Sequence, residues 1–245
     1  MNTLTERRVQ RVRHELKRRH LTVTQVDHLS PHVRRIHFTG ESLADFVSAS
    51  FDDHVKLILN ADSAQPIMRD YTPRHFDTTA RHLSIEFALH GTGPAAQWAA
   101  QARPGDTVVV GGPRGSFIVP TDYDWHLLVG DDTALPAIQR RLDELPATTQ
   151  AVVVAQVAHA EDRPALHSAA QLSLHWVNTE AELLTTVAAL PLPAGEGYAW
   201  GAGEARLMTE LRRLLVGPKG LNPQQMRVAA YWKRGTSAHH ENLEA

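Results

Sequence analysis

The stretch HLLVGDDTALPAIQRRLDEL, residues 126–145, decides the fold of the second half of this chain. It begins with a short apolar run and continues with helical character. The next apolar run, QAVVVAQVA at residues 150–158, has no polar alternation, which indicates a strand buried on both faces. Further strand candidates (LHWV, YAW and RVAAYW) alternate with helical stretches at Glu180–Leu190 and Glu204–Val216. This βαβ series predicts a parallel sheet covered by helices.

The first half has a different texture, from Leu21 to about Pro120. Apolar residues alternate in Val55–Leu59 and Leu83–Leu89, and Gly, Pro, Asp and Asn separate the runs. Several short strands with turns between them predict an antiparallel barrel or sandwich. One short helix is expected at Pro94–Gln101, where proline takes the first position. We therefore predict two domains, residues 1–120 and residues 121–245.

Composition excludes several kinds of chemistry. The chain has 245 residues, a formal net charge of -2 and no cysteine. Disulfides, thiolate-bound clusters and a cysteine nucleophile are therefore excluded, and redox chemistry would need an organic cofactor or a non-thiolate metal. The 15 histidines are scattered without a ligand-like spacing, so we predict no dedicated metal site.

The termini and the hydropathy indicate a cytoplasmic protein. No apolar run reaches the roughly 20 residues that a membrane span needs, and the N-terminus lacks the apolar core of a secretory signal. Residues 1–20 hold seven Lys and Arg against two Glu. We expect them to form a solvated helix or arm, because no nucleic-acid recognition motif accompanies them.

The segment RDYTPR, residues 69–74, carries the first candidate binding residues. In a strand, Arg69 and Tyr71 share one face. A guanidinium can bind a pyrophosphate with two parallel hydrogen bonds, a tyrosine ring can stack on a flat conjugated ring, and the hydroxyl of Thr72 can bond a ring nitrogen. This set fits a flavin dinucleotide, and the alternative is an ordinary surface strand with an Arg/Asp pair.

Two glycine-rich turns follow. HGTGPA, residues 90–95, leads into the short helix that carries Trp98, and a glycine turn before a helix start can cradle an anion. A strand-to-helix turn that needs glycine is the alternative. The turn Gly111–Ser116 either closes the barrel or contributes to binding, and the sequence favours neither.

Two motifs follow strands of the second half, where parallel sheets bind their ligands. GDDTA, residues 130–134, lacks the GxGxxG fingerprint, and its aspartates suit ribose or adenine better than a pyrophosphate. GAGE, residues 201–204, suits the nicotinamide part of a nucleotide. For both motifs, a capped helix start is the alternative. Near the end of the chain, YWKRG at residues 231–235 can form a basic rim for an anionic substrate together with Lys56, Arg74 and Arg114, and a solvated charged tail is the alternative.

Together these motifs resemble the siderophore-interacting protein family of flavin reductases, within the ferredoxin–NADP reductase superfamily. The resemblance runs from FDDHVKL at residues 51–57 to YWKRG and rests on the order and spacing of the motifs. It implies an antiparallel β-barrel domain that binds FAD, followed by an α/β parallel-sheet domain that binds a nicotinamide nucleotide.

The resemblance also implies roles for individual residues. Arg69 would hold the flavin phosphates, Tyr71 would lie against the isoalloxazine, and Asp131 would bound the adenosine end. The full set of cofactor-binding residues that we expect is Arg69, Tyr71, Thr72, His90, Gly91, Gly93, Pro94, Ala95, Trp98, Gly115, Ser116, Asp131, Thr133, Ala134, Gly201, Gly203 and Glu204. The expected residues of the ferric-siderophore site are Lys56, Lys233 and Arg234.

The implied activity is reduction of ferric iron in a siderophore or another ferric chelate. The resemblance favours NADPH as donor, and NADH stays possible because Glu161 and Asp162 flank Arg163 on one side. Two alternatives stay open: a flavoprotein that passes electrons to a protein partner or free flavin, and a siderophore-binding protein without turnover. The sequence does not specify an oligomeric state.

Overall fold

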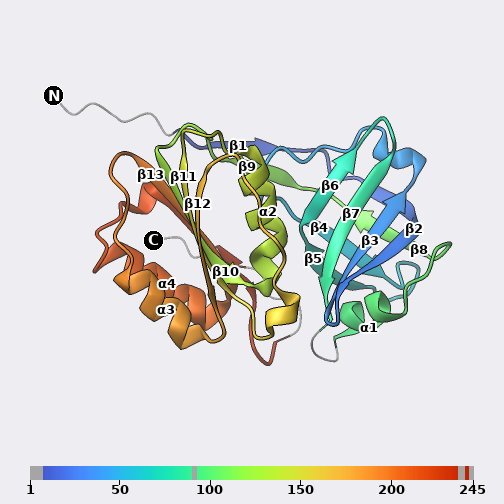
Figure 1. Cartoon of the computed structure of the whole chain (residues 1–245). Coiled ribbons are helices and arrows are strands. Elements are labelled where there is room, and N and C mark those ends of the chain that lie inside the picture. The colour runs from blue at the N-terminus through green and yellow to red at the C-terminus, as the bar shows by residue number, and fades with distance from the viewer. Residues whose placement is uncertain (1–7, 90–92, 237–240, 243–245) are drawn as a thin grey trace.

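The computed structural model describes residues 8–89, 93–236 and 241–242, and it contains two large sheets that lie side by side (Figure 1). The first is a seven-stranded antiparallel sheet with the order β5-β4-β8-β2-β3-β7-β6. Its strands are β2 (Arg18–Ser30), β3 (Val33–Thr39), β4 (Val55–Leu59), β5 (Ile67–Tyr71), β6 (Pro73–Asp77), β7 (His82–Ala88) and β8 (Thr107–Gly111).

The first sheet curls because its two edge strands are consecutive in the chain. Strand β5 ends at Tyr71 and β6 begins at Pro73, so Thr72 alone separates the two edges. A sheet whose edges meet in this way closes around its own core. The closed core holds fully buried side chains such as Phe38 and Phe87, and helix α1 (Pro94–Gln101) packs against it. The predicted barrel and the predicted helix are confirmed.

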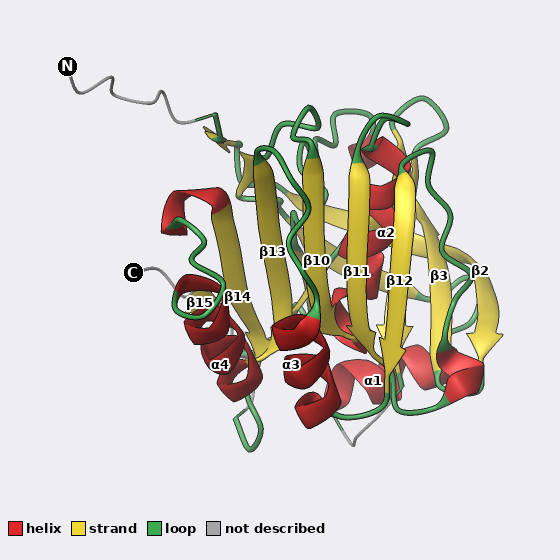
Figure 2. Cartoon of the chain, turned by 60° about the vertical axis from the view of Figure 1, so that its left-hand side comes forward, coloured by secondary structure: helices red, strands yellow, loops and turns green. Residues whose placement is uncertain are grey.

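The second sheet has the order β12-β11-β10-β13-β14-β15 and is parallel except for its last strand. Its strands are β10 (Trp125–Asp131), β11 (Gln150–Gln156), β12 (Gln171–Val177), β13 (Gly197–Glu204), β14 (Met226–Trp232) and β15 (Glu241–Asn242). Helix α2 (Leu135–Glu144) covers the face toward the barrel, and α3 (Glu180–Ala189) and α4 (Ala205–Val216) cover the other face (Figure 2).

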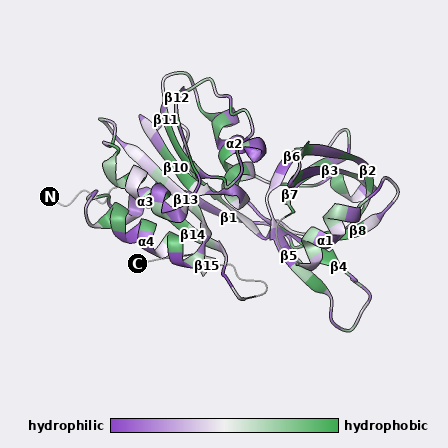
Figure 3. Ribbon diagram, turned by 60° about the horizontal axis from the view of Figure 1, so that its bottom comes forward, coloured by the Kyte–Doolittle hydropathy of each residue, from purple (hydrophilic) through white to green (hydrophobic). Residues whose placement is uncertain are grey.

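Burial on both faces explains the sequence pattern of the central strands. Every residue of β10 and of β13 is buried, and much of β10 and β11 is hydrophobic (Figure 3). One apolar cluster fills the space between the sheet and α2, and a second fills the space beneath α3 and α4. The predicted parallel α/β arrangement is confirmed.

Between β11 and β12 the chain forms one short 3-10 helix, η3 (Ala160–Asp162), and no α-helix.

The N-terminal segment is an extended arm. Strand β1 (Gln10–Arg13) pairs with β9 (Gly115–Ile118) in a separate two-stranded sheet. Arg8 lies over the Tyr123 ring and forms ion pairs with Asp122 and Glu196. The basic segment thus packs along both halves of the molecule. Of the two forms expected from the sequence, a helix or an arm, β1 shows the extended arm.

Candidate functional site

A cavity of about 1020 Å³ lies where the barrel meets the carboxyl ends of the parallel strands. This volume is at the upper end of the roughly 300–1,000 Å³ of small-molecule sites. The barrel contributes β5, the start of α1 and the turn between β2 and β3. The α/β half contributes the start of α2, the segment around η3 and the end of β14.

The barrel wall exposes the motif at residues 69–72 to the cavity. Arg69 and Tyr71 share one face of β5, an edge strand, and the Tyr71 ring packs 4.5 Å from the ring of Phe87. Burial raises the pKa of Tyr71 to about 12, although the nearby Arg69 lowers it, so the phenol stays neutral at physiological pH. The wall therefore offers a cation and a neutral aromatic ring side by side.

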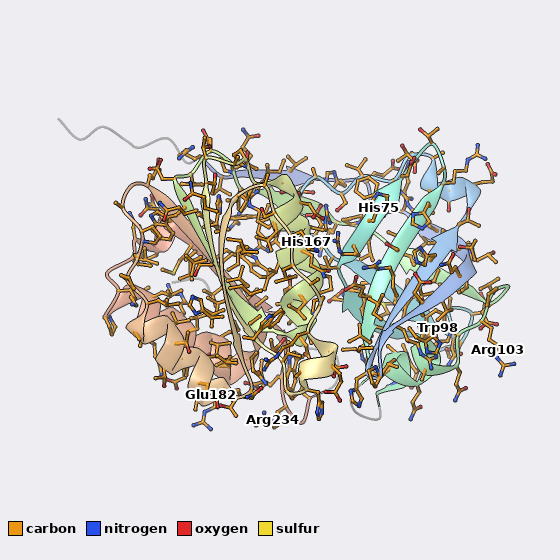
Figure 4. All side chains as sticks on the ribbon, viewed as in Figure 1. His75, Trp98, Arg103, His167, Glu182 and Arg234 are labelled. Carbon is orange, nitrogen blue, oxygen red and sulfur yellow. The ribbon has the colours of Figure 1, made fainter. Side chains whose placement is uncertain are left out.

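The facing wall is formed by the end of β14. Tyr231 lines the cavity opposite Thr72, and its ring packs edge-on against Trp200, with the ring centroids 6.3 Å apart. The next residue, Trp232, donates its indole N–H to Oδ2 of Asp131 over 2.8 Å. Lys233 and Arg234 follow, and both line the cavity (Figure 4 labels Arg234). The aromatic and basic residues of YWKRG thus lie opposite the barrel motif.

Asp131 lies beneath the cavity, where it holds three segments together. Its Oδ1 accepts from the backbone N–H and the hydroxyl of Thr133, and its Oδ2 accepts from Trp232 and from the backbone N–H of Glu204. Burial and the neighbouring Asp132 raise the pKa of Asp131 to about 6, against the hydrogen bonds of Thr133 and Trp232. The carboxylate is therefore mostly ionised at neutral pH and is surrounded by donors.

Glu204 has a similar structural position at the end of β13. Its Oε2 caps α4 by accepting from the backbone N–H groups of Arg206 and Leu207, and its Oε1 accepts from the backbone N–H of Arg234. A Cβ on Gly203 would lie 2.6 Å from Oδ2 of Asp131, so glycine is needed for this close packing. Capping, the alternative for both strand-end motifs, is the role that the contacts show.

A third side of the cavity is a contact between the halves. Asp162 of η3 accepts hydrogen bonds from the hydroxyl of Ser30 and from Nδ1 of His32, the latter over 2.8 Å. The His32 ring also stacks on His159, with the ring centroids 4.9 Å apart. Ser30, Val33 and Asp162 line the cavity, and of these three only Asp162 was expected from the sequence to bear on nucleotide binding, as a carboxylate that favours NADH. Ser30 and Asp162 lie 132 positions apart, so no local motif links them.

Ion pairs reduce the positive charge of the basic rim. The ammonium group of Lys56 lies 2.7 Å from Asp70, and Arg234 lies 2.8 Å from Glu180. Within the described part of the chain, Lys233 has no side-chain hydrogen bond or ion pair. Among the described residues, Lys233 is thus the rim cation that no neighbouring carboxylate neutralises.

The structure brings about half of the expected residues to this cavity. Those that line it are Lys56, Arg69, Tyr71, Thr72, Gly93, Pro94, Ala95, Thr133, Lys233 and Arg234. Those that do not line it are Trp98, Gly115, Ser116, Asp131, Ala134, Gly201, Gly203 and Glu204. His90 and Gly91 lie outside the described residues.

The turn at Gly111–Ser116 serves the barrel and the N-terminal arm. Ser116 donates to the buried carboxylate of Asp53 over 2.6 Å and contacts His14 over 2.7 Å. A Cβ on Gly115 would lie 2.5 Å from the carbonyl oxygen of Val12, so glycine allows β1 to pair closely with β9. Of the two roles that the sequence left open, these contacts favour the structural one.

Two other findings concern metals and membranes. The described residues contain no group of three or more His, Asp or Glu side chains arranged to hold a metal ion. None of the helices in the described ranges is long and apolar enough to cross a membrane.

The two-sheet fold is one that ferredoxin reductases share. The chain shares its fold with the ferredoxin reductase in carbazole 1,9a-dioxygenase, with a TM-score of 0.70 at 16% identity over 89% of this chain and 68% of that one. The family model described as Siderophore-interacting FAD-binding domain matches residues 22–65 and 60–117. The model described as Siderophore-interacting protein matches residues 123–235. The chain belongs to the siderophore-interacting protein family.

Individual relatives agree with this assignment. The chain is 35% identical to the NADPH-dependent ferric-chelate reductase of Escherichia coli (strain K12), over 93% of this chain and 98% of the relative. The crystal structure of a siderophore utilization protein from T. fusca matches with a TM-score of 0.87 and 34% identity, over 94% of this chain and 98% of that one.

Proposed function

We propose that this protein is an FAD-dependent reductase that takes electrons from NADPH and delivers them to ferric iron held in a siderophore or a similar chelate. One observation carries the proposal: a single cavity has an aromatic and cationic barrel wall opposite an aromatic and basic wall at the parallel-strand ends. Such a cavity can hold a flavin ring between a nicotinamide donor and an anionic acceptor. The activity named for the E. coli relative supports the same conclusion.

The residues that line the barrel wall fit the flavin. Arg69 would bind the phosphates, Tyr71 would lie against the isoalloxazine, and Thr72 would bond its polar edge. Gly93, Pro94 and Ala95 at the start of α1 are small, so they leave room for a ligand beside that wall, and Ala95 is almost fully buried. FAD, when bound, supplies the conversion of a two-electron donor into single-electron delivery. The protein supplies orientation, shielding from water and charge.

Asp131 and Glu204 would act on this site by positioning other groups. Asp131 fixes the indole of Trp232, and Glu204 fixes the backbone of Arg234. Both fixed residues line the cavity. Gly201 and Gly203 would allow the dense packing of these strand ends, because a Cβ at either position would lie within 3 Å of a neighbouring side chain.

The donor is NADPH in this proposal, because of what surrounds Arg163. The neighbouring carboxylate of Asp162 is turned to Ser30 and His32, so it is not available to a ribose hydroxyl. Arg163 lines the cavity, donates to the side chain of Asn178, and has a buried Nε without a partner within the described residues. A partly exposed guanidinium at the cavity wall suits the extra phosphate of NADPH.

The acceptor is anionic in this proposal. Hard oxygen ligands hold ferric iron far better than ferrous iron, so reduction loosens the chelate. Lys56, Lys233 and Arg234 would attract a negatively charged ferric complex in a salt-dependent way. We place the reaction in the cytoplasm, where NADPH is available, and we propose residues 1–120 and 121–245 as the FAD-binding and nicotinamide-binding domains.

An anaerobic experiment tests the proposal. The protein is reconstituted with FAD, reduced with NADPH or NADH, and mixed with a ferric catecholate siderophore and a ferrous trap. We expect flavin reoxidation that matches the ferrous signal, with faster flavin reduction by NADPH. Reduced flavin that stays reduced beside the chelate would indicate a protein acceptor instead. A protein that cannot take up FAD would overturn the proposal.

A further inference from the structure

The loop before β4, residues 48–53, reaches from the barrel into the core of the α/β half. Its Phe51 is fully buried in the apolar cluster that fills the space between the parallel sheet and α2. The Phe51 ring meets the Trp200 ring edge-on, with the ring centroids 5.4 Å apart, and the guanidinium of Arg141 lies 5.0 Å from the centre of the Phe51 ring. A residue of the first half is therefore packed inside the second half.

Asp52, the next residue of the loop, contacts two neighbouring strands of the parallel sheet. Its Oδ2 accepts from the indole N–H of Trp200 on β13 over 3.1 Å and lies 3.0 Å from Nε of Arg227 on β14. Trp200 and Arg227 are direct partners across the two strands. The Asp52 carboxylate is buried, and removal of one partner from a buried ion pair leaves the other charge uncompensated. Asp52 thus attaches the loop firmly to β13 and β14.

Two contacts lead from Asp52 to the main cavity. The indole of Trp200, whose N–H is held by Asp52, packs edge-on against the ring of Tyr231. Tyr231 lies four residues after Arg227 on β14 and lines the cavity. Burial and then the charge of Asp52 raise the pKa of Tyr231, so the phenol at the cavity wall stays neutral at physiological pH. Both the position and the ionisation of this wall residue therefore depend on Asp52.

Other contacts between the halves involve different elements of the α/β half. Arg140 of α2 donates to the hydroxyl of Ser48 and to the carbonyl oxygen of Pro73, and η3 contacts the turn between β2 and β3. Asp52 instead binds the strands β13 and β14. Strand β14 leads directly into residues 231–234, which form the wall opposite the barrel motif. A change at Asp52 therefore acts on the separation of the two cavity walls.

We propose that Asp52 is a positioning residue that sets the distance between the two cavity walls and thereby the rate at which NADPH reduces the flavin. The inference rests on the proposed function, in which the flavin lies at the barrel wall and the nicotinamide at the facing wall. Hydride transfer needs reacting atoms about 3–3.5 Å apart, and a displacement of about 1 Å can slow a reaction about 100-fold. Asp52 itself does not line the cavity, so it acts through Trp200 and β14.

The adjacent Asp53 provides a matched control. It is 3% exposed, against 5% for Asp52, and its partners lie in the first half of the chain. Its Oδ2 accepts from the hydroxyls of Ser48 and Ser116 and from the backbone N–H of Ser50. Asp53→Asn should therefore weaken the loop as a fold element and leave the contact of the loop with β13 and β14 in place.

The first test measures the distance between the halves with no ligand bound. The chain has no cysteine, so Ala80→Cys on the barrel and Thr185→Cys on α3, both at exposed positions, can carry two spin labels at defined places. Double electron–electron resonance should give the same distance distribution for the labelled chain with and without Asp53→Asn. With Asp52→Asn we expect a broader or displaced distribution, because the loop no longer holds β13 and β14 by an ion pair.

The second test separates flavin reduction from flavin binding. Stopped-flow absorbance follows the reduction of the FAD-loaded protein at saturating NADPH, and flavin fluorescence gives the dissociation constant of FAD. Asp52→Asn should slow the limiting rate of reduction about 10- to 100-fold and leave the dissociation constant unchanged, because the barrel wall is intact. Asp53→Asn should leave both quantities unchanged.

Arg227→Gln breaks the same ion pair from the α/β side, and it replaces Asp52→Asn if that variant does not fold. It should slow reduction to a similar extent, and the double variant should be no slower than the slower single variant, since both residues act through one contact. Limiting rates or distance distributions equal to those of Asp53→Asn would overturn the inference. If neither nicotinamide nucleotide reduced the unaltered protein, the proposed function would fail, and the distance distributions would still decide whether Asp52 fixes the two halves.

Discussion

The two walls of the main cavity use their polar motifs in opposite ways. On the barrel side, all five residues of β5 are partly exposed, and Arg69 and Tyr71 face the cavity. On the α/β side, all residues of β13 are buried, and Asp131 and Glu204 turn inward to accept backbone and indole N–H groups. The barrel wall thus presents its motif to a ligand, whereas the facing wall uses its motifs to hold β14 in place.

The difference follows from where each strand lies in its sheet. Strand β5 is an edge strand, so one side of it has no neighbouring strand and its side chains reach the cavity. Strands β10 and β13 are central, with helices on both faces, so a polar group at their ends is surrounded by protein. A buried carboxylate must be satisfied by hydrogen bonds. In this molecule, the polar motif on the edge strand is therefore free for a ligand. The polar groups at the ends of the central strands form hydrogen bonds within the protein instead.

The largest expected effect comes from a substitution of Asp131, whose buried carboxylate holds the α/β wall together. In Asp131→Asn, the amide N–H₂ would face donors whichever way the side chain is turned, because each oxygen of Asp131 accepts two hydrogen bonds. Leaving buried donors unsatisfied costs about 1–3 kcal/mol per group, so we expect a loss of about 2–4 kcal/mol in the free energy of unfolding. Urea denaturation measures this loss.

The matched control is Asp122→Asn. Asp122 pairs with Arg8 on the surface, where its side chain is 75% exposed. Surface ion pairs contribute about 0–1 kcal/mol, so this variant should unfold almost like the unaltered protein. A loss for Asp131→Asn no larger than that for Asp122→Asn would show that the contacts of Asp131 do not stabilise the fold.

The second-largest expected effect comes from a substitution of Arg69 on the barrel wall. Arg69→Ala removes the cation that would bind the flavin phosphates, and a hydrogen bond to a charged group contributes about 1.5–3 kcal/mol. We expect FAD to bind about 10- to 150-fold more weakly, with little change in the free energy of unfolding, because the only side-chain hydrogen bond of Arg69 among the described residues is to the carbonyl oxygen of Met68. Flavin fluorescence and urea denaturation give the two quantities.

Arg103→Ala is the control for this effect, since Arg103 lies in the turn after α1, away from the main cavity (Figure 4). It should change neither FAD affinity nor stability. If Arg69→Ala kept stoichiometric FAD with unchanged affinity, the phosphate-binding role of Arg69 would be refuted.

The same contrast explains what the sequence could predict. Local periodicity and turn residues gave the barrel, the parallel sheet and the exact bounds of α1, because these depend on near neighbours. The shared face of Arg69 and Tyr71 also followed from strand geometry alone. At Asp131 and Glu204, the sequence could not separate a helix cap from a ligand, since both roles use the same carboxylate chemistry. The contact of Ser30 with Asp162 depends on the packing of the two halves.

A third prediction uses pH to examine the buried core of the α/β half. Burial, assisted by Arg141, lowers the pKa of His126 to about 3, below its ordinary value of 6.5. As pH falls from 7 to 5, the unfolded chain therefore takes up a proton that the folded protein does not, and stability falls. The slope from this one group is at most about 1.4 kcal/mol per pH unit.

Paired variants isolate this effect from other titrating groups. His126→Gln should flatten the fall in the free energy of unfolding between pH 7 and pH 5 more than His167→Gln, which removes an exposed histidine of the α/β half (Figure 4). Identical slopes for His126→Gln and the unaltered protein would show that His126 is protonated in the folded state at pH 5.

The smallest expected effect concerns the basic rim, where the two walls again differ. Lys56 on the barrel wall is paired with Asp70, whereas Lys233 on the facing wall has no such partner within the ranges that the structure describes. Both Lys56→Ala and Lys233→Ala should raise the apparent KM for an anionic ferric chelate more than that for a neutral dye. Lys233→Ala should have the larger effect, about two- to fivefold, because exposed charge interactions contribute about 1 kcal/mol or less.

Asp70→Asn tests the same contrast in the opposite direction, because it frees the charge of Lys56. This variant should lower the KM for the anionic chelate, and the gain should shrink as salt is added, since added ions screen exposed charges. The neutral dye serves as the control in each variant. Equal changes for the anionic chelate and the dye would show that the lysines act by shape rather than by charge, and the basic rim would then have no role in substrate choice.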